Sequence, residues 1–319
     1  MSKSSSIQKN ARVAVLLGGM SSERVISLKS GKAVLEALKS RGWDAHAVDV
    51  GPDLPEKLRA MQADVAWVAL HGQFGEDGCV QGLLEIMRIP YTGSAVRGSA
   101  IAMDKVSTKR VLRGSGIPMA KDHVWRPGTP VPHDLGWPVV AKFPEGGSTI
   151  GVNICRDQAA LDAALTELGG MGDEVLLEQF VTGAEITVAV LDGEPLPVVG
   201  IEPESGFFDY EAKYTKGMTR YVAPARIDEA VARTAQAHAA RAYRELGLAG
   251  VARADFIVDA QGTPWFLEIN TIPGMTATSL SPMAAAVIGV SFEELVERIL
   301  LSAKLHLERR DQTDQRGSH

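Results

Sequence analysis

The order of predicted strands and helices changes partway along this chain, and this change limits most strongly the folds that it can adopt. Short apolar runs at residues 13–17, 44–50 and 65–70 alternate with helical patterns at residues 22–40 and 79–87. Alternation of this kind predicts parallel strands connected by helices. After about residue 138 the strands follow one another more directly, which predicts antiparallel pairing. The expected fold class is therefore α/β followed by α+β.

The chain of 319 residues is long enough for two or three domains. Residues 93–98 are small and turn-rich, as expected of a boundary. Residues 206–221 combine Gly, Asp, Lys, Thr and aromatic side chains without a clear period, which predicts a long functional loop. Beyond residue 98, strands are predicted at 139–142, 151–155, 174–180, 185–191, 196–201, 250–258 and 264–270, and helices at 99–114, 158–168, 228–246 and 292–305.

The last two predicted strands flank Gln261-Gly262, and each carries a carboxylate. If these two residues form a tight turn, Asp255 lies opposite Glu268. Residues two apart on a strand share a face, so Arg253 and Asn270 join the two carboxylates. Two carboxylates and an amide oxygen at this separation suit a hard cation such as magnesium. A solvated surface hairpin is the alternative, and a three-residue loop with a bulge would shift the register by one.

A Gly/Ser-rich loop follows the strand that ends at Lys142. The backbone N–H groups of such a loop can approach phosphate oxygens closely, although a plain hairpin turn is also possible. The loop matches neither the Walker pattern nor a dinucleotide-binding fingerprint, which argues against a Rossmann dehydrogenase. Lys105 and Lys213 are further candidates for contacting phosphate, alongside solvated surface lysines as the simpler interpretation.

Charge and composition exclude several classes of protein. The net charge of −6 gives no basic field for nucleic acid or anionic membranes. We expect no transmembrane helix, because about 18 consecutive apolar residues do not occur. The polar N-terminus lacks the apolar core of a signal peptide, and Cys79 and Cys155 lie far apart in sequence, so we expect a cytoplasmic protein with reduced thiols.

Eight segments in series resemble the D-alanine–D-alanine ligases of the ATP-grasp superfamily. Each is a weak signal alone, but together they keep the family's order over residues 12–305. The segments are Gly18-Gly-Met-Ser-Ser-Glu-Arg24, His71-Gly-Gln-Phe-Gly-Glu-Asp-Gly78, Met103-Asp-Lys105, Gly147-Ser-Thr-Ile-Gly151, Gly183-Ala-Glu-Ile-Thr187, Tyr210-Glu-Ala-Lys-Tyr214, Arg253-Ala-Asp255 and Glu268-Ile-Asn-Thr-Ile-Pro-Gly-Met-Thr276.

The resemblance implies an ATP-grasp fold of three domains: an N-terminal α/β substrate domain (11–98), a central subdomain (99–182) and a C-terminal subdomain (183–308) with a mobile loop at 206–221. ATP would bind between the last two. Lys105 and Lys142 would contact the ATP phosphates, and Lys213 would reach the γ-phosphate. Glu178 and the main chain of Val181 would hold the adenine, and Glu185 the ribose. Ser148 and Thr149 are also implied ATP-binding residues. Asp255, Glu268 and Asn270 would hold two Mg²⁺ or Mn²⁺ ions.

The implied reaction joins two D-alanine molecules through an acyl phosphate, for peptidoglycan precursor synthesis. Glu23 would hold the ammonium of the first substrate, with Ser148 and Tyr214 linked to it, and His71 would line its pocket. Arg253 and the Gly274 N–H would stabilise the oxyanion, and Ser279 and Leu280 would bind the carboxylate of the second substrate. The family also implies a homodimer. Simpler roles are a helix cap for Glu23, a core histidine for His71 and loop packing for Tyr214.

Two positions depart from the family pattern: Phe143 stands where proline is usual, and Gly146 where glutamate is usual. The two changes predict a more flexible phosphate loop, in which the spacing of Lys142, Ser148 and Thr149 is kept. A D-alanine–D-lactate ligase is the main rival interpretation. Such ligases often carry histidine where Tyr214 stands, so tyrosine favours D-alanine as the acceptor. A nucleotide-binding regulator without turnover is disfavoured, because none of the expected metal ligands is missing.

Overall fold

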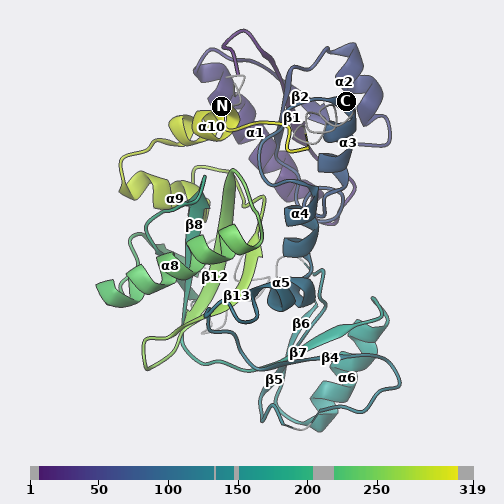
Figure 1. Cartoon of the computed structure of the whole chain (residues 1–319), viewed down its shortest axis with the longest axis vertical. Helices are drawn as coiled ribbons and strands as arrows, with labels where there is room; N and C mark the ends of the chain where they lie inside the picture. Colours follow the sequence, from purple (N-terminus) through teal and green to yellow (C-terminus); the bar gives the residue numbers. More distant parts are fainter. Residues whose placement is uncertain (1–6, 133, 147–150, 204–218, 308–319) are drawn as a thin grey trace, which may run out of the picture.

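The computed structural model describes residues 7–132, 134–146, 151–203 and 219–307. These residues form three sheets, with strand orders β2-β1-β3, β4-β7-β5-β6 and β11-β10-β8-β12-β13, the last with β9 paired to β8. Figure 1 shows the first sheet at one end of the long axis, the second at the other end and the third between them. The predicted change from parallel to antiparallel pairing is confirmed.

The first sheet is a parallel α/β layer, as predicted. Its strands β1 and β3 are almost wholly apolar and buried, which is the pattern of a sheet covered on both faces. Helix α2 was not predicted, although Pro55 in its first turn is a typical start signal. The elements are β1 (Arg12–Leu17), α1 (Arg24–Ser40), β2 (Asp44–Asp49), α2 (Leu54–Ala60), β3 (Val65–Val68) and α3 (Cys79–Met87).

The single helix predicted over residues 99–114 is wrong: two helices, α4 (Val96–Met103) and α5 (Lys105–Leu112), meet at Asp104. Asp104 has an extended backbone, and its carboxylate accepts hydrogen bonds from the N–H groups of Val106 and Ser107. This is an N-cap, which favours Asp because the first N–H groups of a helix have no partner in the helix. The cap turns the chain so that Lys105 leads α5.

The second sheet is antiparallel and has α6 (Gln158–Gly169) on one face. Leu161, Leu165 and Leu168 of α6 are buried at helical spacing in the core of this unit. β4 lies in a Pro- and Gly-rich stretch before residue 138 and is only four residues long. The strands are β4 (Asp122–Trp125), β5 (Val139–Lys142), β6 (Val152–Cys155) and β7 (Val175–Gln179).

The third sheet carries the predicted hairpin, and α8 (Glu229–Glu245) covers one of its faces. The strand predicted at 196–201 is confirmed in part, because β10 begins at residue 199 and runs past 201, while a short β9 comes before the predicted range. Helix α9 (Leu280–Val287) was not predicted. The predicted loop 206–221 overlaps β11 at its end, and its residues up to 218 lie outside the described residues. The strands are β8 (Ala184–Leu191), β9 (Glu194–Pro195), β10 (Val199–Pro203), β11 (Thr219–Val222), β12 (Val251–Val258) and β13 (Pro264–Asn270).

The last described residues return to the first sheet. Helix α10 (Phe292–Leu301) packs beside α1, and Trp67 of β3 donates a hydrogen bond to the Val296 carbonyl (3.4 Å). Lys304 then pairs with Tyr91 through two backbone hydrogen bonds of 3.2 and 3.4 Å. The predicted final helix at 292–305 therefore ends earlier, because the chain becomes extended to make this bridge.

Glu297 of α10 connects three groups near the start of the chain. It accepts hydrogen bonds from Lys9 (2.6 Å), the Arg41 Nε (2.6 Å) and the Trp43 indole (2.7 Å). The bonds from Arg41 and Lys9 lower the pKa of Glu297 from 4.5 to about 2. The folded state therefore favours the ionised carboxylate more than the unfolded state does, and this stabilisation is present above the unfolded pKa.

We expect Glu297→Gln to destabilise the protein by about 1 to 2 kcal/mol at neutral pH, because it removes charge-assisted hydrogen bonds. The difference from the parent chain should shrink as pH falls from about 4.5 through 2, because Glu297 is protonated in both the folded and the unfolded state only below the lower value. Urea unfolding at pH 7 and pH 3 measures it. Glu36→Gln, at an exposed carboxylate of α1, is the matched control. If Glu297→Gln lowered the free energy of unfolding equally at pH 7 and pH 3, the stabilisation could not come from the charge of Glu297.

Candidate active site

The predicted hairpin pairs Arg253 with Asn270 and Asp255 with Glu268, so this prediction is confirmed. The predicted two-residue turn is wrong. The Asp259 N–H donates to the Thr263 carbonyl (3.1 Å), which leaves residues 260–262 in the turn, and Gly262 takes a φ of 79°. Nearer the turn, Phe256 pairs with Phe266, one step out of register. The longer turn shifts the pairing by one residue, and a β-bulge between Asp255 and Phe256 shifts it back. Asp255 therefore still pairs with Glu268.

Asp255 is held in place from two strands. The Arg253 guanidinium donates to both of its oxygens, at 2.9 Å from Nε and 2.7 Å from the second nitrogen. Thr187, its cross-strand neighbour on β8, donates to Oδ1 at 2.5 Å. Burial opposes the charge on Arg253, but Asp255 outweighs this and raises the pKa of the guanidinium. A bidentate pair of this kind fixes both side chains in a defined geometry.

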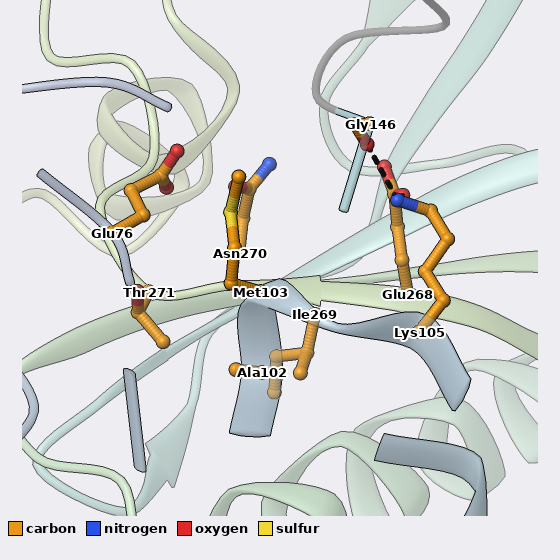
Figure 2. Close-up of a pocket in the computed structure, with 9 residues that line it drawn as sticks. All are labelled: Glu76, Ala102, Met103, Lys105, Gly146, Glu268, Ile269, Asn270 and Thr271. Carbon is orange, nitrogen blue, oxygen red and sulfur yellow. Dashed lines mark hydrogen bonds and ion pairs between the residues drawn. The ribbon is translucent and has the colours of Figure 1, made fainter. Parts of the chain in front are cut away.

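Glu268 faces the lysine that begins α5. Lys105 Nζ lies 3.0 Å from Glu268 Oε2 and donates to the Gly146 carbonyl at 2.6 Å. Figure 2 shows Lys105 and Glu268 side by side, with Gly146 of the loop after β5 above them. Lys105 thus connects the hairpin to the loop after β5, and its side chain is only 9% exposed.

Glu76 joins the hairpin to the first sheet. Its carboxylate accepts from the Gly72 N–H (2.8 Å) and the Ile272 N–H (3.3 Å). With the Asn270 amide oriented to satisfy both of its ends, its nitrogen donates to Glu76 Oε1 (3.0 Å) and its oxygen accepts from Arg253 (3.2 Å). Burial raises the pKa of Glu76 to about 8, and the nearby Glu23 adds to the rise. Figure 2 places Glu76 and Asn270 in one small pocket.

A cleft between the second and third sheets has polar ends and apolar walls. Lys142 Nζ lies 2.5 Å from Glu178 Oε2, and this pairing raises the pKa of Lys142 although burial opposes it. The cleft brings together seven of the predicted site residues, namely Lys105, Lys142, Glu178, Val181, Glu185, Asp255 and Glu268. Its apolar walls come from Ala120, Val140, Val152, Ile154, Phe180, Ile257 and Leu267. Such a slot is suited to a flat, largely apolar ring with a charged tail.

The predicted substrate residues His71 and Glu23 lie beside Glu76. His71 is buried and its Nε2 lies 3.0 Å from Ser30 Oγ, which accepts from the Met275 N–H (3.2 Å). Burial lowers the pKa of His71 to about 4, so the imidazole is neutral at pH 7. Glu23 does not cap α1 with its side chain. Its carboxylate lies against Gly72, where an added Cβ would come within 2.8 Å of Glu23 Oε2.

The remaining predicted residues divide into two groups. Ser279 precedes α9, and its hydroxyl accepts from the Thr276 N–H (3.1 Å) beside Gly274, with Leu280 next in the chain. The second group is Ser148, Thr149, Lys213 and Tyr214, which lie outside the described residues.

Sequence reasoning missed Glu76 and Thr187 as site residues, and it missed Lys109, whose Nζ forms an ion pair with the Oε1 atom of Glu178. Glu76 and Thr187 belong to motifs that were recognised, so their position in those motifs was the available signal. Lys109 gave a weaker signal: it follows Lys105 by one helical turn on the same face of α5.

Family models and individual relatives all identify the same protein family. Two family models match the chain: D-ala D-ala ligase N-terminus over residues 48–94 and D-ala D-ala ligase C-terminus over residues 116–301. The D-alanine–D-alanine ligase of Syntrophotalea carbinolica is 49% identical over 295 residues, covering 92% of this chain and 96% of that protein. That of Anaeromyxobacter sp. strain Fw109-5 is 50% identical over 299 residues, covering 92% and 97%.

Solved structures agree with the sequence relatives. The D-alanine–D-alanine ligase of Bacillus anthracis complexed with ATP superimposes with a TM-score of 0.81 at 31% identity, covering 92% of this chain and 97% of that one. The ligase of Coxiella burnetii gives a TM-score of 0.80 at 25% identity. These proteins have the ATP-grasp fold, which confirms the fold expected from the sequence. The chain belongs to the D-alanine–D-alanine ligase family.

Proposed function

We propose that this protein uses ATP to join two molecules of D-alanine into D-alanyl-D-alanine, through an acyl-phosphate intermediate, for peptidoglycan precursor synthesis. The observation that carries the proposal is the position of Asp255 and Glu268. They lie directly opposite each other on β12 and β13, at a cleft that Lys105 and Lys142 also line. This arrangement gathers the charges that a transferring phosphoryl group requires.

The donor set of the hairpin fits divalent cations. Among the described residues, no group of three or more His, Cys, Asp or Glu side chains could hold a metal ion. Asp255, Glu268 and the Asn270 amide instead offer hard oxygen donors, and Arg253 and Lys105 balance the two carboxylates. Such a set is suited to Mg²⁺ or Mn²⁺ completed by phosphate oxygens and water. Two bound ions would neutralise charge on the transferring phosphoryl group.

In the first step, a carboxylate oxygen of one D-alanine attacks the γ-phosphorus of ATP. The bond from that phosphorus to the ADP oxygen breaks, and the products are ADP and the acyl phosphate. Lys105 and Lys142 are buried cations that already face carboxylates, so they would hold the phosphates without first losing a full shell of water. Glu178 and the Val181 main chain would bind the adenine, Glu185 the ribose, and Ser148, Thr149 and Lys213 the phosphates.

In the second step, the amine of the other D-alanine attacks the acyl carbon, and inorganic phosphate leaves. Arg253, which lies between Asp255 and Asn270, and the Gly274 N–H would stabilise the oxyanion. Glu23 would bind the first ammonium, neutral His71 would line that pocket, and Ser279 and Leu280 would bind the second carboxylate. Ser148 and Tyr214 would connect Glu23 to the loop at 206–221.

We expect phosphate release from ATP to rise with D-alanine, and the product formed near neutral pH with both D-alanine and D-lactate present to be mainly the dipeptide. A coupled phosphate assay and chromatography of the product measure both quantities. If the product were mainly the depsipeptide, the preferred acceptor would be D-lactate and not D-alanine. Phosphate release that does not respond to D-alanine would favour the nucleotide-binding regulator instead.

Three expectations about the whole molecule stay predictions. These are the homodimer, the cytoplasmic location, and the division into units at 11–98, 99–182 and 183–308. None of the helices within the described residues is long and apolar enough to span a membrane.

A further inference from the structure

Lys109 is a lysine that is buried almost completely. Its side chain is 2% exposed on the inner face of α5, and its Nζ donates to the Ala120 carbonyl at 3.1 Å. The same Nζ forms an ion pair with Glu178 Oε1 and lies 3.6 Å from Asp122 Oδ1. Lysine is rarely buried to this degree unless it is paired, so these oxygens determine where its ammonium group lies.

Glu178 lies between two ammonium groups. Lys142 pairs with its Oε2 and Lys109 with its Oε1, while the side chain is 3% exposed. Burial opposes the charge on Glu178, but Lys142 and Lys109 outweigh it and lower the pKa of this carboxyl. Asp122 lies directly opposite Glu178 on β4, so two carboxylates balance the two ammonium groups.

The two lysines differ in what they face. Lys142 lines the nucleotide cleft together with Glu178, whereas Lys109 is not among the residues that line it. In the proposed function, Lys142 contacts phosphate, and an ammonium group shared with phosphate neutralises Glu178 less. Lys109 does not line the cleft, so it stays paired with Glu178 when the nucleotide is bound. A buried carboxylate that loses its counter-charge takes up a proton or moves.

We propose that Lys109 is a positioning residue that sets the choice of nucleotide base, by holding Glu178 as a charged acceptor at the base end of the cleft. This inference rests on the proposed function, in which Glu178 meets the adenine. A carboxylate accepts a hydrogen bond from the 6-amino group of adenine and repels the 6-oxo group of hypoxanthine. A protonated Glu178 could instead donate to that oxo group, so losing Lys109 would weaken discrimination between the two bases.

The test compares ATP with ITP, which has an oxo group in place of the 6-amino group. We expect Lys109→Met to lower the ratio of kcat/KM for ATP to kcat/KM for ITP at least tenfold, while Lys109→Arg keeps it within about threefold. Both nucleotides are measured on one preparation, so the ratio is insensitive to a partly inactive sample. Equal losses with ATP and ITP would overturn the proposal, because they would indicate a structural role only.

Arg113→Ala is the matched control, because Arg113 also pairs with Asp122 (3.2 Å) but is exposed and does not contact Glu178. The ratio should not change in this variant. In a Glu178→Gln background, Lys109→Met should cause no further change in the ratio. A further change there would show that Lys109 acts by another route. If Lys109→Met alone does not fold, the double variant Glu178→Gln/Lys109→Met can be used, because it leaves no unpaired charge between these two residues. It is compared with Glu178→Gln/Lys109→Arg. Equal ATP-to-ITP ratios for the two double variants are expected, and different ratios would show that Lys109 acts by another route.

The two proposals fail in different ways. If the parent chain shows no D-alanine-dependent phosphate release with ATP, the proposed function is wrong. If the parent chain is active and prefers ATP, but the preference does not depend on Lys109, only the inference about Lys109 is wrong.

Discussion

Replacing Glu268 by glutamine is expected to lower D-alanine-dependent phosphate release by roughly 10³-fold while the fold persists. Glutamine keeps the shape of the side chain but removes the charge that faces Lys105 at 3.0 Å. It also removes one of the two carboxylates proposed to hold the metal ions. Lys105 keeps its hydrogen bond to the Gly146 carbonyl, and the repulsion between Glu268 and the opposed Asp255 is removed, so the loss of stability should be small.

Three measurements check this expectation. They are the coupled phosphate assay, Mn²⁺ binding in the presence of ATP, which should weaken at least tenfold, and thermal unfolding, which should change little. Glu194→Gln, at an exposed carboxylate on β9 of the same sheet, is the matched control and should keep full activity. Unchanged turnover in Glu268→Gln would mean that the metal assignment is wrong.

Gly183→Ala is expected to destabilise the protein by about 3 kcal/mol or more. An added Cβ would lie 2.0 Å from the Val258 carbonyl oxygen, and a backbone atom cannot rotate away. β8 pairs with β12 from the residue after Gly183 onward, so the clash would push these strands apart. Thr187 and Asp255 form their 2.5 Å hydrogen bond across the same pair, so activity should fall together with stability.

Gly82→Ala in α3 is the matched control, because the nearest atom to its added Cβ is 3.9 Å away. Alanine is the better helix former, so this change should stabilise the protein by about 0.5 to 1 kcal/mol. Urea unfolding of both variants beside the parent chain measures the two effects. Similar midpoints for the two variants would argue against the close approach of β8 and β12 at Gly183.

The strands with the clearest patterns were predicted best. β5 and β13 have the predicted bounds and β12 differs at one end only, because each is a mainly apolar run flanked by Gly, Pro or polar turn residues. The break at Asp104 was missed, although an Asp before a helix is a recognisable cap. The error in the turn after Val258 came from Gln261-Gly262, which suggested a two-residue turn where Asp259 and Thr263 close a longer one.

The candidate site was predictable where its residues are close in sequence. Counting along the hairpin was enough to place Asp255 opposite Glu268. Glu76 could not be found in this way, because its partner Ile272 is 196 residues further along the chain. The pairing of Lys109 with Glu178 likewise depends on how α5 packs against a separate sheet, which no local pattern specifies.

The return of the chain to its first sheet affects the order in which this protein can finish folding. During synthesis β1, β2 and β3 leave the ribosome well before Val296, Glu297 and Lys304, which they and their neighbours contact; Trp67 and Val296, for example, are 229 residues apart. Contacts between residues so far apart in sequence form slowly, because closing a long loop costs entropy. The nascent N-terminal sheet therefore keeps the part of its apolar face that α10 covers exposed until α10 has been synthesised, and this interval is when the chain is most exposed to aggregation.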